Sequence, residues 1–229
     1  MESFEEQAQA AVELVSALAE MENAGRNIVT TLLGGADFLA LEHYPPDDVR
    51  DPETNAQYYF HAHRGTVESG HIHCFLRDAE NRLTHVAAIG LDQTGRPARM
   101  FTTNLWVTAD VFTPAEVLIE QLPHMNWSAA PGPKPVNRAL GALFVLYRRE
   151  IAGLLRRRDA RLARHAAAIA PADPLEDERL EVLSTARINL PATLARLRAR
   201  LARTDEEHPR QLADNGAAGR IARSERADG

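Results

Sequence analysis

Apolar residues near the start of the chain recur three or four positions apart, which predicts an amphipathic helix. The residues of this stripe are Phe4, Ala8, Val12, Val15 and Leu18. Ser3 precedes the stripe, and Glu6 follows three residues later, as in a capping box. We therefore expect the helix to begin directly after Ser3.

The pattern changes to that of strands at Gln57. Four short segments rich in aromatic and β-branched residues follow, separated by turn-like connections: QYYFHAHR, GHIHCFL, THVAAIGLD and ARMFTTNLWV. Connections this short favour antiparallel neighbours, because a parallel pair needs a long crossover. We predict a small antiparallel β-meander of about four strands over residues 57–107, and a loop over the proline- and aspartate-rich residues 42–55.

Helical patterns return after the predicted meander. A capping box beginning at Thr113 opens a short helix that ends before Pro123, and a long apolar stripe runs from Asn137 to Asp159. Two further helical stretches cover residues 176–188 and 192–202. The expected fold is α+β: the meander packs with an N-terminal helix and with C-terminal helices over 137–203. We expect one domain over residues 1–203 and a disordered tail over 204–229.

The amino-acid composition limits which classes of binding partner are expected for this chain. The net charge of −6 among 229 residues argues against a nucleic-acid surface and against binding to an anionic membrane. Neither a signal peptide nor a membrane span is evident, so we expect a cytoplasmic protein. Cys74 is the only cysteine, which excludes an intramolecular disulfide. A small-molecule substrate is the expected partner, and the oligomeric state is left open.

Four histidines fall within thirteen residues as two H-x-H pairs: His61, His63, His71 and His73. Side chains alternate across a strand, so the members of each pair share a face. In a hairpin centred on Val67, His63 would oppose His71 and His61 would oppose His73. Opposed Cβ atoms lie ~4.5–5.5 Å apart, so four imidazoles at such corners can converge on one ion. We predict a histidine metal site on this face.

Further residues extend the predicted site. His85 joins the same face as a fifth ligand if the next turn aligns it with His73, and Thr103 follows on the fourth strand. Glu68, in the turn, is a candidate carboxylate, and Tyr59 shares the histidine face as a candidate proton donor. Arg64 is a candidate to orient a carboxylate or carbonyl substrate. The upstream Asp47, Asp48 and Asp51 either fold over the site or form a solvated turn.

The ligand set suggests a divalent transition metal. Imidazoles suit iron, zinc, copper and nickel, and manganese when carboxylates join, whereas calcium and magnesium prefer oxygen. The main interpretation is a metal-dependent enzyme, an oxidoreductase or a hydrolase, of unknown substrate. The alternatives are a non-catalytic metal-binding or storage protein, metal-free histidine catalysis or ligand binding, histidines with a purely structural role, and a metal-free interaction scaffold built on the C-terminal helices.

Two resemblances accompany this interpretation. His61, His63 and Glu68 resemble part of the first metal motif of the cupins, in which two histidines, a glutamate and a later histidine hold a metal inside a β-barrel. More of the chain, about Glu42 to Asp159, is similar to an uncharacterised bacterial family of domains of unknown function. The segments that carry this likeness are H-Y-P at 43–45, H-A-H-R at 61–64, G-H-I-H-C-F at 70–75 and F-T-T-N-L-W-V-T at 101–108. This second resemblance implies no activity.

Overall fold

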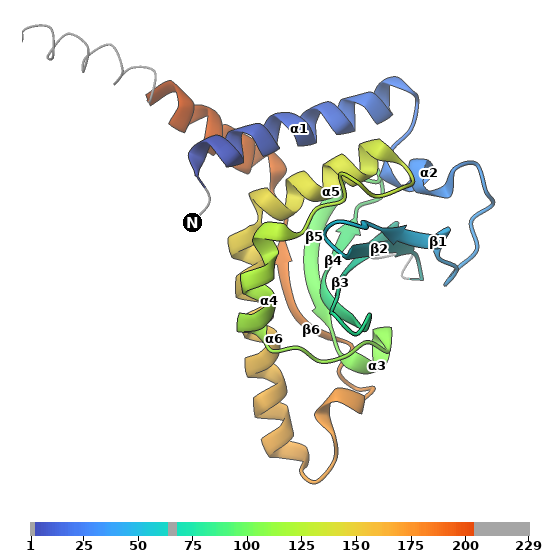
Figure 1. The fold of residues 1–229 in the computed structure, drawn as a ribbon, viewed down its shortest axis with the longest axis vertical. Helices are drawn as coiled ribbons and strands as arrows, with labels where there is room; N and C mark the ends of the chain where they lie inside the picture. The colour runs from blue at the N-terminus through green and yellow to red at the C-terminus, as the bar shows by residue number, and fades with distance from the viewer. Residues whose placement is uncertain (1–2, 64–67, 204–229) are drawn as a thin grey trace, which may run out of the picture. The chain divides into compact units, whose positions relative to one another are not determined.

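The computed structural model describes residues 3–63 and 68–203, so Arg64, Val67 and the tail predicted over 204–229 lie outside the described residues. Contacts group the chain into a larger unit, Met1–Ile188, and a second one, Asn189–Gly229. In the second unit, residues 190–203 are helical. The larger unit holds the sheet and the remaining helices (Figure 1). No helix in the described ranges is long and apolar enough to cross a membrane.

The α+β prediction is confirmed, but the antiparallel sheet has six strands instead of about four. They follow one another in the sheet in chain order, as in a meander. The strands are β1 (Tyr44–Arg50), β2 (Ala56–His61), β3 (Gly70–Arg77), β4 (Leu83–Leu91), β5 (Pro97–Thr103) and β6 (Val182–Arg187).

The two unpredicted strands are the edges of the sheet. β1 lies in the segment predicted as a loop, where Pro45 and Pro46 cannot donate ladder hydrogen bonds. An edge strand tolerates them, and the register shifts between Tyr44 and Val49. β6 lies in the segment predicted as a helix over 176–188. It pairs with β5, which is distant in the sequence.

The helices also differ from the prediction. The capping box expected at Thr113 is not formed, because the short helix begins at Ala115, directly after Pro114, and has no side-chain cap. The stripe from Asn137 to Asp159 is divided between two helices at Tyr147, and the end of the predicted fourth strand, around Trp106, is a helical turn capped by Asn104. The helical elements are α1 (Phe4–Asn23), α2 (Ile28–Leu33), α3 (Leu105–Thr108), α4 (Ala115–Gln121), η1 (Leu122–His124), α5 (Lys134–Leu146), α6 (Arg148–Ile169) and η2 (Pro174–Glu176). Ser3 caps α1 by accepting from the Glu6 backbone N–H, as predicted.

The two faces of the sheet have different chemistry. One face is apolar and fully buried, with Tyr58, Phe60, Ile72, Cys74, Ile89 and Met100. Its strands contact the helices: the Tyr58 hydroxyl lies 2.7 Å from Oδ1 of Asn137 in α5, and the Ser184 hydroxyl donates to the Leu154 carbonyl in α6. The other face carries the histidines.

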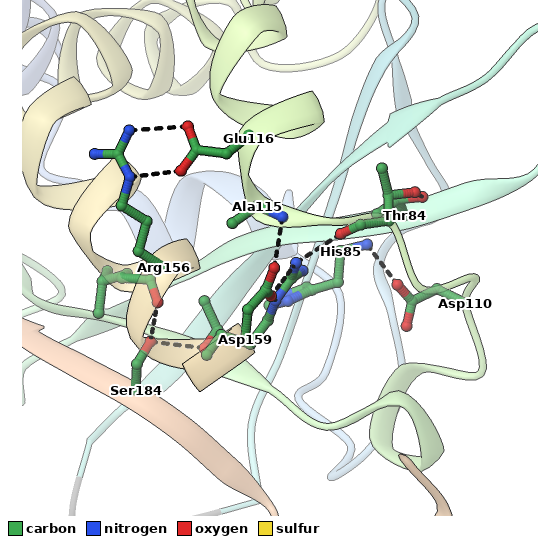
Figure 2. Close-up of polar contacts among 12 residues, drawn as sticks. Thr84, His85, Asp110, Ala115, Glu116, Arg156, Asp159 and Ser184 are labelled. Carbon is green, nitrogen blue, oxygen red and sulfur yellow. Dashed lines mark hydrogen bonds and ion pairs between the residues drawn. The ribbon is translucent and has the colours of Figure 1, made fainter. Parts of the chain in front are cut away.

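A partly buried polar network joins α4 to α6 beside the sheet (Figure 2). The Asp159 carboxylate accepts from the Ala115 backbone N–H at 2.7 Å, at the start of α4. The same carboxylate pairs with Arg158, which also donates to the Thr113 carbonyl. Asp159 therefore satisfies one of the unpaired donors of a helix start and balances a buried guanidinium at once.

Replacing Asp159 with alanine is expected to lower the free energy of unfolding by about 1–3 kcal/mol, because both hydrogen bonds are charge-assisted and partly buried. Urea denaturation followed by circular dichroism measures the change. Glu116→Ala is the matched control, since its ion pair with Arg156 is solvent-exposed (Figure 2). Equal destabilisation by the two variants would contradict the role of Asp159.

Candidate metal centre

Three histidines converge at the ends of two neighbouring strands. His61 is the last residue of β2, His63 follows two residues later, and His71 is the second residue of β3. One ligand atom from each of the three lies within 4.8 Å of the others. The trio spans a gradient of exposure, because His71 is buried, His61 is half-buried and His63 is exposed. The three imidazoles can hold a metal ion.

The strand register differs from the prediction by two residues. His61 opposes His71, and Tyr59 opposes His73, whereas a hairpin centred on Val67 would pair His63 with His71. A shift of two residues keeps every side chain on its face, so the histidines remain together. The first residue of β3 has to be glycine, because a Cβ on Gly70 would lie 2.4 Å from the Phe60 ring.

His71 is held by a buried carboxylate. Its Nδ1 lies 2.7 Å from Oε1 of Glu68, and Oε2 of Glu68 accepts from Nε of Arg99 at 2.8 Å. A carboxylate accepts hydrogen bonds, so Nδ1 of His71 carries a proton, and in the neutral ring, the form that binds metals, Nε2 presents a lone pair. That Nε2 lies 2.7 Å from Nε2 of His61. A carboxylate that orients the outer nitrogen of a histidine is the usual support of metal ligands in proteins.

The absence of a side chain at Gly90 leaves space for the Glu68 carboxylate and the Arg99 side chain. A Cβ at Gly90 would lie 2.5 Å from Oε2 of Glu68 and 2.8 Å from Cγ of Arg99. Gly90 stands opposite both His71 and Arg99 in the ladder. The sequence therefore needs glycine here for the close approach of the carboxylate to the sheet.

The carboxyl group of Glu68 is ionised at neutral pH. Burial acts to raise its pKa, but the hydrogen bonds and charges of His71 and Arg99 outweigh that effect and lower the pKa below the ordinary 4.5. Glu68 was predicted as a carboxylate near the site, and the structure places it there. In the cupin motif the glutamate is a metal ligand, whereas this glutamate contacts His71 and Arg99.

His73 and His85 lie deeper on the same face. Nδ1 of His73 is 3.0 Å from Nε2 of His85, and Nδ1 of His85 is 3.3 Å from the Thr103 hydroxyl. The prediction that His85 aligns with His73 is wrong, since His73 stands opposite Ala88. A β-bulge returns His85 to the histidine face: Cys74 pairs with Ala87 and Phe75 with His85, so Val86 is the extra residue.

Both deep histidines are neutral. Burial, the charge of Arg158 and His71 lower the pKa of His85 to about 3. Burial, followed by His85 and the other histidines, holds the pKa of His73 well below 6.5. The backbone N–H of His85 donates to Asp110 at 2.6 Å, and this contact fixes the bulged strand (Figure 2). Neutral imidazoles are the form that binds metals.

Tyr59 forms a wall of the site. Its ring is almost fully buried and stacks on His43 at 3.6 Å, with 9° between the ring planes. Burial, with the charges of Asp48 and Asp110, raises the pKa of Tyr59, so the phenol keeps its proton at neutral pH. Its predicted role as a proton donor stays a prediction.

Asp48 contacts residues beside the site, whereas Asp51 does not. It accepts from Nε2 of Gln57 at 2.7 Å and lies 3.1 Å from Nδ1 of His43. His43 was not among the predicted site residues, although it opens the H-Y-P segment. Asp51 instead accepts from the backbone N–H groups of Glu53 and Thr54, which is a turn role.

The donors present fit a transition metal. Three imidazole nitrogens suit zinc, copper, iron or nickel, whereas calcium and magnesium require several oxygen ligands. The buried carboxylate behind His71 raises the basicity of that ligand. Two nitrogens that bind one zinc ion at ~2.0–2.1 Å lie farther apart than 2.7 Å in a tetrahedral site, so a small separation of the His61 and His71 rings admits an ion.

Comparison with known proteins gives a family without an assigned activity. None of the curated proteins and none of the solved structures matches this chain. The family model described as a domain of unknown function, DUF6969, matches residues 8–188, which include the whole sheet and every histidine discussed above. The chain therefore belongs to the DUF6969 family.

Proposed function

We propose that this protein is a metal-dependent enzyme whose transition-metal ion is bound by His61, His63 and His71. The observation that carries the proposal is the convergence of three imidazole nitrogens within 4.8 Å. Two of these nitrogens, Nε2 of His61 and Nε2 of His71, lie 2.7 Å apart.

The direction of the hydrogen bonds around His71 also supports a metal site. Glu68 fixes the proton on the outer nitrogen, so the inner nitrogen offers its lone pair toward His61. Arg99 in turn fixes Glu68 through an ion pair with 2.7 Å between Nη2 and Oε2. A chain of this kind holds the ring orientation before an ion arrives, which lowers the entropic cost of binding.

Three protein ligands favour catalysis over a purely structural role. A catalytic zinc site keeps a position for water or substrate, whereas a structural site is closed by four protein ligands. An ion with an open position lowers the pKa of bound water or polarises a carbonyl oxygen. Glu68 positions His71, and Tyr59 limits the space beside the trio. The substrate would be a small molecule that enters on the exposed side, at His63.

Metal content is the direct test. Wild-type protein purified without chelators is expected to carry or take up one transition-metal ion per chain, as measured by elemental analysis and zinc titration. The double variant His61→Ala/His71→Ala is expected to lose that ion, because two of the three nitrogens are gone. His124→Ala is the matched control, since His124 is exposed in η1.

Two outcomes count against the proposal. Substoichiometric metal in the wild type after zinc titration would reject the metal centre altogether. A bound ion that leaves the spectrum of the cobalt-substituted protein unchanged on addition of azide would reject the open position, and a storage or structural role would replace the enzyme.

A further inference from the structure

His73 has a buried ring nitrogen that the hydrogen bonds described above do not use. The side chain is 1% exposed, and its Nε2 has no hydrogen-bond partner among the residues that the structure describes. Leaving a polar atom buried and unsatisfied is costly, and such atoms in native proteins generally have an unseen partner. A partner on the Nε2 side of His73 would satisfy this atom.

The chain of contacts behind His73 indicates what that partner is. If Nδ1 of His73 donates to Nε2 of His85, and Nδ1 of His85 donates to the Thr103 hydroxyl, each contact has one donor and one acceptor. This arrangement leaves a lone pair on Nε2 of His73. The reverse arrangement leaves an N–H there, which a nearby cation would disfavour. A lone pair in a buried place is a ligand for a cation.

His73 also repeats the arrangement of His71. The two residues are two positions apart on β3, so their side chains share a face. In each of them Nδ1 is held by a buried partner, Glu68 for one and His85 for the other. The ring of His73 lies 4.8 Å from that of His71 and 5.0 Å from that of His61, measured between centroids.

His63 differs from these residues in its surroundings. It lies two residues beyond the end of β2 and is exposed, whereas His71 and His73 lie within a strand and are buried. A side chain outside the ladder is less constrained than one inside it, and it moves at a lower cost. Of the four candidate ligands, His63 is the one that an incoming molecule displaces most readily.

We propose that His73 is a permanent ligand of the ion, together with His61 and His71, and that His63 is the replaceable ligand at the entry side, so that three protein ligands remain when an outside ligand binds. This inference rests on the proposed metal centre and adds which nitrogens hold the ion and where an outside ligand enters. His85 and Thr103 act as positioning residues for His73. The outside ligand is a small molecule or anion with one donor atom.

The wild-type protein permits a direct test that no folding defect can obscure. With isotope-labelled histidine side chains and a bound cadmium ion, nuclear magnetic resonance detects coupling between cadmium and each ligating nitrogen. Nε2 of His73 is expected to show this coupling. A cadmium-bound protein in which His61, His63 and His71 are coupled and His73 is not would overturn the inference and leave the proposed metal centre intact.

Two substitutions test the division of roles by zinc titration. His73→Leu is expected to weaken zinc binding by more than about 100-fold, beyond the ~10–100-fold typical of residues that only support a ligand. His63→Ala is expected to weaken it less than about tenfold and to tighten azide binding to the cobalt form. A larger loss in His63→Ala than in His73→Leu would overturn the inference. Failure of the wild type to bind any metal would instead reject the proposed function itself.

Discussion

Acidifying the metal-free protein from about pH 6.5 to about pH 5 is expected to lower its free energy of unfolding by about 2 kcal/mol through His85 alone. The pKa of His85 is about 3 in the folded protein, against 6.5 for an ordinary histidine. Between these values the unfolded chain binds a proton that the folded chain excludes, so acid favours unfolding. The loss begins as the pH falls below about 6.5 and continues down to about pH 3. Urea denaturation at a series of pH values measures it.

Two variants isolate this effect. His85→Gln removes the titrating group, so its stability is expected to change less with pH than that of the wild type, even if its stability at pH 7 is lower. His124→Gln removes an exposed histidine and is expected to keep the wild-type slope. If His85→Gln retained the full slope, the buried neutral state of His85 would not be the cause.

Replacing Glu68 with glutamine is expected to weaken zinc binding by about 10–100-fold, the range found when the partner of a ligating histidine is removed. Glutamine keeps the shape of the side chain, but it loses the charge that fixes the proton on Nδ1 of His71. It also leaves Arg99 without its counter-charge. Isothermal titration calorimetry with zinc measures the change in the dissociation constant.

The control is Glu80→Gln, which neutralises an exposed carboxylate paired with Arg82 at the β3–β4 turn. It is expected to leave the dissociation constant unchanged, since that pair is distant from the site and screened by solvent. Equal zinc affinity in Glu68→Gln and the wild type would show that the orientation of His71 does not depend on the carboxylate.

The grouping of the histidines could be predicted because it depends on parity. Alternation along β3 places His71 with His73 whatever the exact register, and the observed shift of two residues keeps His61 on their face. The register itself could not be predicted, because a shift of two residues leaves every side chain on the same face and so leaves the periodic pattern unchanged.

The edge strands could not be predicted for a different reason. Pro45 and Pro46 argue against a strand, and only the position of β1 at an edge, with its irregular register, makes them acceptable. Residues 182–187 have a pattern that suits a helix or a strand, and the choice is made by β5, which supplies the ladder. Tertiary partners of this kind override local preference.

The bulge at Val86 allows the spacing of the site residues along β4 to vary. One extra residue in β4 turns His85 toward the other histidines, where an unbroken ladder that included Val86 would turn it to the apolar face. Deleting the codon for Val86 would make the ladder regular and leave His85 opposite Phe75, on the histidine face. The spacing between this histidine and the rest of the strand can therefore differ by one residue among family members while the histidine keeps its place in the site, so comparison by sequence position alone would not identify it.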